Sequence, residues 1–247
     1  MSRVGSSAET SNTLQETVPI DIMSRESTRQ KLRERAHLQV ALDMPDVGGA
    51  LRICNVLPVE RVILEVGTPL LKSHGIEAIR EIRRVSRGRP VIADTKTLDA
   101  AELEVRIAKE GGADGATVSA LAPFATIEKF GAACERLEMI CLIDLLGHPS
   151  GAEGPPIPLG KADVLVCHMG IDQGTDDEIL RTMTASWRRR YPDKLIAVAG
   201  GIVPRTADGL LREGADIIIV GRYVTASDDP GARALELVKS LDQSAVH

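Results

Sequence analysis

Short apolar runs recur along the chain from residue 38 onward, and polar residues or glycines follow each of them. Eight runs can be recognised. They are near-continuous rather than alternating, which is typical of parallel strands covered on both faces. We therefore expect strands at residues 38–43, 61–67, 91–96, 114–120, 139–145, 163–168, 195–201 and 216–222.

Most intervals between these runs have the periodicity of an amphipathic helix. After residue 98, Leu103 and Ile107 share one helix face, and Glu102 and Arg106 form an i,i+4 pair on the other. An exception is residues 147–162, which are too rich in glycine and proline for a regular helix. Further helices are expected at residues 73–86, 123–137, 175–190, 204–213 and 230–242.

Eight strand–helix units in about 210 residues predict a (β/α)₈ TIM barrel, a single domain over residues 35–247. A doubly wound open sheet is the competing layout. Residues 1–34 are polar and predict a flexible N-terminal extension. Part of it, SRESTRQKLRERA, has the composition of a short charged helix. Deleting residues 1–30 is expected to leave folding and activity nearly unchanged.

Composition narrows the class of protein. Apolar residues make up 43% and charged residues 26% of the chain, as in ordinary globular proteins. No apolar run approaches the ~18 residues that span a bilayer, so no membrane partner is expected. A net charge of -5 and few aromatic residues argue against nucleic-acid binding. The four cysteines form no CxxC pair, which argues against a zinc site. Because Cys141 and Cys167 lie inside apolar runs as small buried residues, we expect a reducing, cytoplasmic setting.

Charged side chains stand where the predicted strands end, which is where parallel barrels carry their chemistry. With a period of two, Asp94 and Lys96 project to the same side of their strand. A single carboxylate at a strand end is usually a helix N-cap or a loop charge, and this is the role expected for Asp144. The simplest role for Asp99, which lies beyond its strand, is to cap the following helix. Together, the other charged side chains indicate a site whose acids need a metal or substrate to balance them. The set is Asp43, Glu65, Asp94, Lys96 and His168.

The last two strands suggest phosphate binding. In barrels, the loops after the seventh and eighth strands often hold a phosphate with backbone N–H groups. Gly200 and Gly201 offer amides without side chains, and Gly221 is followed by Arg222, a forked donor suited to phosphate oxygens.

Several motifs, in order over residues 38 to 242, resemble the orotidine monophosphate decarboxylase suprafamily. The most specific is DxKxxD, here Asp94, Lys96 and Asp99. Orotidine decarboxylases have a lysine after the second strand, where this chain has Glu65. The 3-hexulose-6-phosphate synthases and the 3-keto-L-gulonate 6-phosphate decarboxylases have a glutamate at this position, so the chain most resembles that branch of the suprafamily. The segments that carry the resemblance to the suprafamily are LQVALD, EVGTPLLKSHG, ADTKTLDAAELE, CHMGIDQ, VAGGI and GADIIIVGRYVTASDDP.

The resemblance implies a role for each residue. Glu65 and Asp94 would bind Mg²⁺, for which Mn²⁺ can substitute. Asp43 and Lys96 would polarise a phosphorylated sugar and its enediolate, and His168 would move the proton at C1. Asp99 would reach the partner's site across a homodimer interface. The phosphate would lie against Gly200, Gly201, Gly221 and Arg222.

Three functions follow from the resemblance. The first is a reversible aldol condensation of formaldehyde with D-ribulose 5-phosphate, as in 3-hexulose-6-phosphate synthases. The second is decarboxylation of a 3-keto sugar acid phosphate. Those decarboxylases place an arginine a few residues after the strand-six histidine, whereas HMGIDQG has none after His168. The third is a catalytically silent barrel that binds a sugar phosphate.

Overall fold

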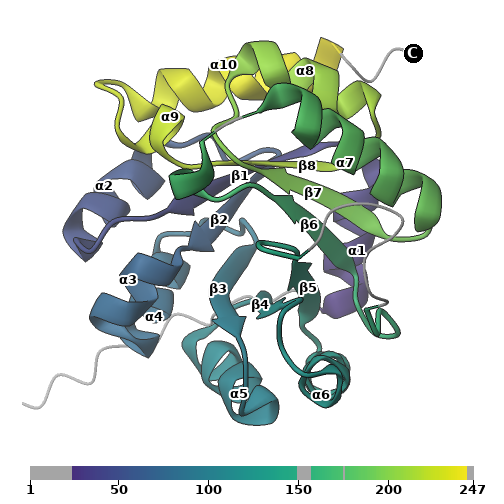
Figure 1. Ribbon diagram of the computed structural model, residues 1–247. Coiled ribbons are helices and arrows are strands. Elements are labelled where there is room, and N and C mark those ends of the chain that lie inside the picture. Colours follow the sequence, from purple (N-terminus) through teal and green to yellow (C-terminus); the bar gives the residue numbers. More distant parts are fainter. Residues whose placement is uncertain (1–23, 149–156, 175, 244–247) are drawn as a thin grey trace, which may run out of the picture.

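The eight predicted strands form one closed parallel barrel in chain order, with β1 also paired to β8 (Figure 1). This confirms the TIM barrel, and the alternative of an open sheet is wrong. The structure is a computed structural model that describes residues 24–148, 157–174 and 176–243. The strands are β1 His37–Leu42, β2 Val62–Val66, β3 Val91–Thr97, β4 Gly115–Ser119, β5 Ile140–Asp144, β6 Val164–His168, β7 Leu195–Ala199 and β8 Ile217–Val220.

Helices surround the barrel (Figure 1). All the predicted helices are present. The segment expected at residues 73–86 is interrupted at Gly75, where α3 ends and α4 begins. Sequence patterns missed α2 and the single turn of α9. Residues 149–156, half of the glycine- and proline-rich segment, lie outside the described residues, and 157–162 contain no helix. The helices are α1 Arg25–Glu34, α2 Val47–Val56, α3 Thr68–His74, α4 Ile76–Arg84, α5 Ala101–Gly111, α6 Phe124–Arg136, α7 Asp177–Arg190, α8 Pro204–Arg212, α9 Arg222–Thr225 and α10 Pro230–Gln243.

Helix α5 forms where expected but turns a different face to the barrel. Leu103 and Ile107 are 50% and 40% exposed, while the small residues of the helix are buried. The reason is the close approach of α4: a Cβ on Gly111 would lie 2.8 Å from Ile79. Small side chains therefore face inward, and the two large ones are left on the outer surface.

The amino ends of β4 and β8 carry similar polar clamps. Asp114 precedes β4, and its carboxylate accepts from the backbone N–H of Val91 at 2.7 Å and pairs with Arg83 of α4. Asp216 precedes β8 and repeats the arrangement, accepting from Ile196 N–H at 2.7 Å and pairing with Arg188 of α7. Each clamp joins two neighbouring strands to the helix that precedes them.

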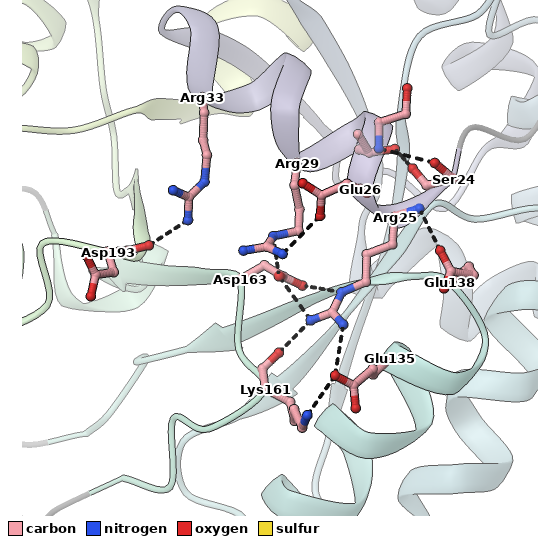
Figure 2. A network of polar contacts seen from close by, with 12 residues as sticks. Ser24, Arg25, Glu26, Arg29, Arg33, Glu135, Glu138, Lys161, Asp163 and Asp193 are labelled. Atoms are coloured by element: carbon pink, nitrogen blue, oxygen red, sulfur yellow. Dashed lines mark hydrogen bonds and ion pairs between the residues drawn. The ribbon is translucent and has the colours of Figure 1, made fainter.

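Asp163, before β6, makes the third clamp, but its arginines come from α1. The carboxylate accepts from Cys141 N–H at 2.9 Å and from Arg25 at 3.1 and 3.0 Å. Arg29 lies 3.0 Å from the same group (Figure 2). Arg83 is the next-to-last residue of α4. The next-to-last residue of α6 is Glu135, which has the opposite charge. The N-terminal helix thus supplies the charge that α6 lacks.

Helix α1 also closes the amino end of the barrel. Its Leu32 is fully buried and belongs to the same apolar cluster as the inward side chains of the strands. The predicted charged helix is therefore confirmed. It lies within the segment expected to be a flexible extension, yet a buried leucine and ion pairs to the buried Asp163 hold it against the barrel. Residues 1–23 lie outside the described residues.

Within the described residues, no helix is both long and apolar enough to cross a membrane.

Candidate active site

Four ionisable side chains from β3, β5 and β6 form one connected chain at the carboxyl end of the barrel. Lys96 Nζ lies 2.6 Å from Asp94 Oδ2 and 3.0 Å from Asp144 Oδ2. Asp144 in turn lies 3.0 Å from His168 Nδ1. Asp94 and Asp144 are buried, while Lys96 and His168 keep partial access to solvent. The structure thus brings together three residues expected from the sequence and one that was not.

Lys96 reaches this position through a bulge rather than through regular alternation. The pairing of β3 with β4 shifts between Ala93 and Thr97, and Lys96 has a φ of 44°. The expectation that Asp94 and Lys96 share one side is correct, but a period of two is not the cause. Such left-handed backbone costs about 1–3 kcal/mol in a residue other than glycine and is concentrated at functional sites.

Asp144, which the sequence suggested was a cap or loop charge, connects His168 to the lysine. Burial alone would raise the pKa of Asp144, but the hydrogen bond and charge of His168, together with Lys96, lower it to about 2. Burial acts to lower the pKa of Lys96, yet Asp94 and Asp144 outweigh it and raise that pKa. Both groups therefore stay charged at neutral pH.

The contact with Asp144 also fixes the tautomer of His168. A carboxylate only accepts hydrogen bonds, so Nδ1 must carry a proton. In the neutral ring, Nε2 then has a free lone pair on the side away from Asp144. In that state, Nε2 can accept a proton from another group.

Glu65 and Asp43 add negative charge beside Asp94. Glu65 is buried, accepts from Gln39 Nε2 at 2.6 Å, and has a pKa raised to about 8 by burial and by the charges of Asp94 and Asp43. Asp43 reaches solvent at the barrel mouth, where partial desolvation and the charge of Asp94 raise its pKa. A Cβ on Gly67 would collide with the Asp43 carboxylate and lie 2.9 Å from the backbone oxygen of Leu42, so a larger residue would displace Asp43.

The donor set fits Mg²⁺. No group of three or more His, Cys, Asp or Glu side chains within residues 24–148, 157–174 and 176–243 is arranged to hold a metal ion. Mg²⁺, however, is usually held by one or two carboxylates, with substrate and water supplying the other oxygens. Glu65 and Asp94 are both buried, and Oε1 of the buried Gln39 has no hydrogen-bond partner among the described residues.

The predicted phosphate-binding residues lie at the ends of β7 and β8. Gly200 and Gly201 have φ values of 136° and 62°, which favour glycine, and a Cβ on Gly200 would meet Met169 at 2.9 Å. Gly221 precedes α9, and Arg222 is exposed at its first position. These residues follow the carboxyl ends of β7 and β8, where the phosphate hypothesis places them, and the hypothesis remains a prediction.

Asp99 stands apart from the other predicted residues. It is exposed beyond the end of β3 and has no hydrogen bond or ion pair with any residue that the structure describes. The alternative role as a cap of α5 is wrong, because the N-cap is Ala100 and no side chain caps the helix. Asp99 thus forms no polar contact with the other predicted site residues within the described part of the chain.

Comparison with known proteins identifies the family. Residues 36–237 match the model of the orotidine 5'-phosphate decarboxylase / HUMPS family, so the chain belongs to that family. Among solved structures, it is similar to a 3-hexulose-6-phosphate synthase, with 30% identity and a TM-score of 0.73 over 83% of this chain and 99% of that one. The synthase of Salmonella typhimurium gives 28% identity and a TM-score of 0.74, over 84% and 99%.

The curated relatives are enzymes of greater length. A "Bifunctional enzyme Fae/Hps" of Methanoregula boonei is 34% identical over 88% of this chain and 56% of its own length. The corresponding protein of Methanococcoides burtonii is 36% identical over 87% and 56%. The chain thus spans about half the length of these relatives. A KGPDC from Streptococcus mutans, 22% identical, shares the fold with a TM-score of 0.72 over 84% and 98%.

The role of Asp144 can be tested with a nearly isosteric amide. Asp144→Asn is expected to lower kcat by about 10²- to 10³-fold, because the neutral side chain no longer fixes the tautomer of His168 or balances Lys96. KM should change little. Steady-state kinetics with the Asp144→Glu variant as the charge-retaining comparison would check this. Equal kcat for Asp144→Asn and the unmodified protein would contradict the assignment.

Proposed function

We propose that this protein catalyses the reversible aldol condensation of formaldehyde with D-ribulose 5-phosphate. The observation that carries the proposal is a cluster of three carboxylates, those of Glu65, Asp94 and Asp43. The cluster lies beside His168, which is oriented by Asp144. Such a site can take a proton from a carbon next to a carbonyl and stabilise the resulting enediolate. The similarity to 3-hexulose-6-phosphate synthases supports this choice of reaction.

In the proposed mechanism, His168 Nε2 removes the proton from C1 of the sugar phosphate, and the electrons of that C–H bond form the 1,2-enediolate. Lys96 donates to the enediolate oxygen while Asp43 holds a sugar hydroxyl. C1 then attacks formaldehyde while the carbonyl at C2 reforms, and the proton held by His168 Nε2 passes to the new alkoxide, which yields the hydroxymethyl group. Mg²⁺, held by Glu65 and Asp94, would supply Lewis-acid stabilisation of the negative charge.

Decarboxylation of a 3-keto sugar acid phosphate is the second candidate, because the fold is shared with KGPDC structures. Residues 169–174, which follow His168, contain no lysine or arginine to bind a substrate carboxylate. That absence favours the small, neutral aldehyde as second substrate.

A coupled assay with Mg²⁺ would distinguish these reactions. Consumption of formaldehyde in the presence of ribulose 5-phosphate, and its release from hexulose 6-phosphate, are expected. CO₂ release from 3-keto-L-gulonate 6-phosphate would favour the decarboxylase. Binding of the sugar phosphate with no turnover in any assay would favour the silent barrel.

An apolar surface around Asp99 supports the proposal of a homodimer with shared sites. Large hydrophobic side chains are exposed at the end of β3, on the neighbouring helices α5 and α6, and in the turn before α6. A second subunit on this surface would cover them and bring its own Asp99 toward the site. The side chains are Leu98, Leu103, Ile107, Leu121 and Phe124.

Subunit mixing would test the shared site. Asp99→Ala and Lys96→Ala homodimers are each expected to be inactive. A mixed dimer would contain one site with both residues intact, so activity should return to as much as about a quarter of the unmodified value with random exchange. Rates measured after mixing, with exchange followed by mass spectrometry, would check this. Full exchange without recovered activity would remove Asp99 from the partner's site.

A further inference from the structure

The backbone of β3 at the site is held in its irregular shape by one hydroxyl group. Thr117, in the middle of β4, is buried. Its Oγ1 accepts from the backbone N–H of Lys96 at 2.9 Å and donates to Asp94 Oδ1 at 2.8 Å. A single side-chain oxygen thus connects the backbone of the lysine to the carboxylate of the aspartate.

The same residue also holds the other side of the bulge. Thr95 Oγ1 donates to the backbone carbonyl of Thr117 at 2.6 Å. Between Ala93 and Thr97 the regular pairing with β4 is interrupted, so these contacts replace ladder hydrogen bonds that a straight strand would make. Both extra contacts of the bulge thus end on Thr117.

The strain at Lys96 needs such support. Its φ of 44° is unfavourable for a lysine, and the N–H of this residue would be left without a partner if the hydroxyl were absent. Asp94 Oδ2 already accepts from Lys96 and from Thr68 Oγ1 at 2.7 Å, so Thr117 alone fixes the other oxygen among the described residues. Rotation of Asp94 would displace the ammonium bonded to it.

We infer that Thr117 is a positioning residue that places both Lys96 and Asp94 for catalysis by imposing the bulge on β3. It acts through these two side chains and touches no reacting atom. The inference rests on the proposed function for its kinetic test, although the shape of β3 can be tested independently of any reaction.

Thr117→Val removes the hydroxyl and keeps the shape, whereas Thr117→Ser keeps the hydroxyl. Valine is expected to lower kcat by about 10- to 100-fold with little change in KM, and serine should retain activity within about threefold. Thr184→Val is the matched control, because Thr184 is also buried and its Oγ1 donates one bond, to Leu180 O at 2.7 Å on α7. That control should leave kcat unchanged.

Crystal structures of the two Thr117 variants supply the readout that does not depend on turnover. With valine, Lys96 should leave the left-handed region and its Nζ should separate from Asp94; with serine, both should stay. Valine with an unchanged bulge would overturn the inference, as would equal loss of kcat in the valine and serine variants. If the unmodified protein fails the aldol assay, the proposed function falls while the structural comparison still decides the role of Thr117.

Discussion

Replacing Glu65 with glutamine is expected to reduce kcat by at least ~10²-fold, equivalent to roughly 3 kcal/mol of transition-state stabilisation. The amide keeps the shape of the side chain but is a weaker ligand for Mg²⁺. Activity of the unmodified protein should likewise vanish with EDTA and return with Mg²⁺ or Mn²⁺. Glu128→Gln, on the exposed side of α6, is the matched control. Full activity in EDTA would contradict a metal-assisted reaction.

The same variant should be more stable than the unmodified protein when metal is absent. Burial, Asp94 and Asp43 raise the pKa of Glu65 from 4.5 to about 8, so the folded protein keeps a proton that the unfolded chain releases above pH 4.5. The free energy of unfolding therefore falls as pH rises from 4.5 to 8, by at most about 1.4 kcal/mol per pH unit. Glutamine does not ionise, so the free energy of unfolding of the Glu65→Gln variant should not fall in this way.

Urea denaturation in EDTA at several pH values would measure the effect. The stability difference between variant and unmodified protein should be near zero below pH 4.5 and largest above pH 8. Mg²⁺ should reduce it by favouring the charged carboxylate. A difference that stays constant across this pH range would show that Glu65 does not carry this proton.

Deleting residues 1–30 is expected to destabilise the protein strongly, contrary to the expectation from sequence. The deletion removes Arg25 and Arg29, the two arginines that form ion pairs with the buried carboxylate of Asp163. Removing one partner of a buried ion pair costs about 3–5 kcal/mol. In a domain of this size, about 3 kcal/mol corresponds to a fall in melting temperature of roughly 6–12 °C.

Two comparisons make this test specific. Deletion of residues 1–23 keeps every described contact of α1 and should leave the melting temperature nearly unchanged. In the 1–30 deletion, Asp163→Asn should recover part of the loss, because the buried group is then neutral. An unchanged melting temperature after deletion of residues 1–30 would mean that α1 does not stabilise the barrel.

The sequence predicts the barrel well because its strands are buried on both sides and therefore appear as continuous apolar runs. Residue types at the strand ends also locate most of the site. Asp144 was missed because a carboxylate after a strand has the same pattern whether it caps a helix or orients a histidine. Only the position of β6 beside β5 brings His168 within 3.0 Å of it.

Other differences come from tertiary packing. The bulge in β3 depends on Thr117 of the next strand, and no local pattern around Lys96 predicts it. The sequence predicted that Leu103 and Ile107 form the buried face of α5. The close approach of α4 instead favours alanine and glycine on the buried face. The polar sequence of α1 resembled an extension, because its arginines contact residues found far along the chain.

The docking of α1 has a consequence for the order in which the chain folds. Arg25 precedes its partner Asp163 by 138 residues, and Arg33 contacts Asp193 O, 160 residues further on. A helix of ten residues is marginal in water on its own. The first of the described helices to leave the ribosome must therefore wait until β5 and β6 have been synthesised and paired. Contacts of such high sequence separation slow folding, and α1 is placed to complete the barrel rather than to nucleate it.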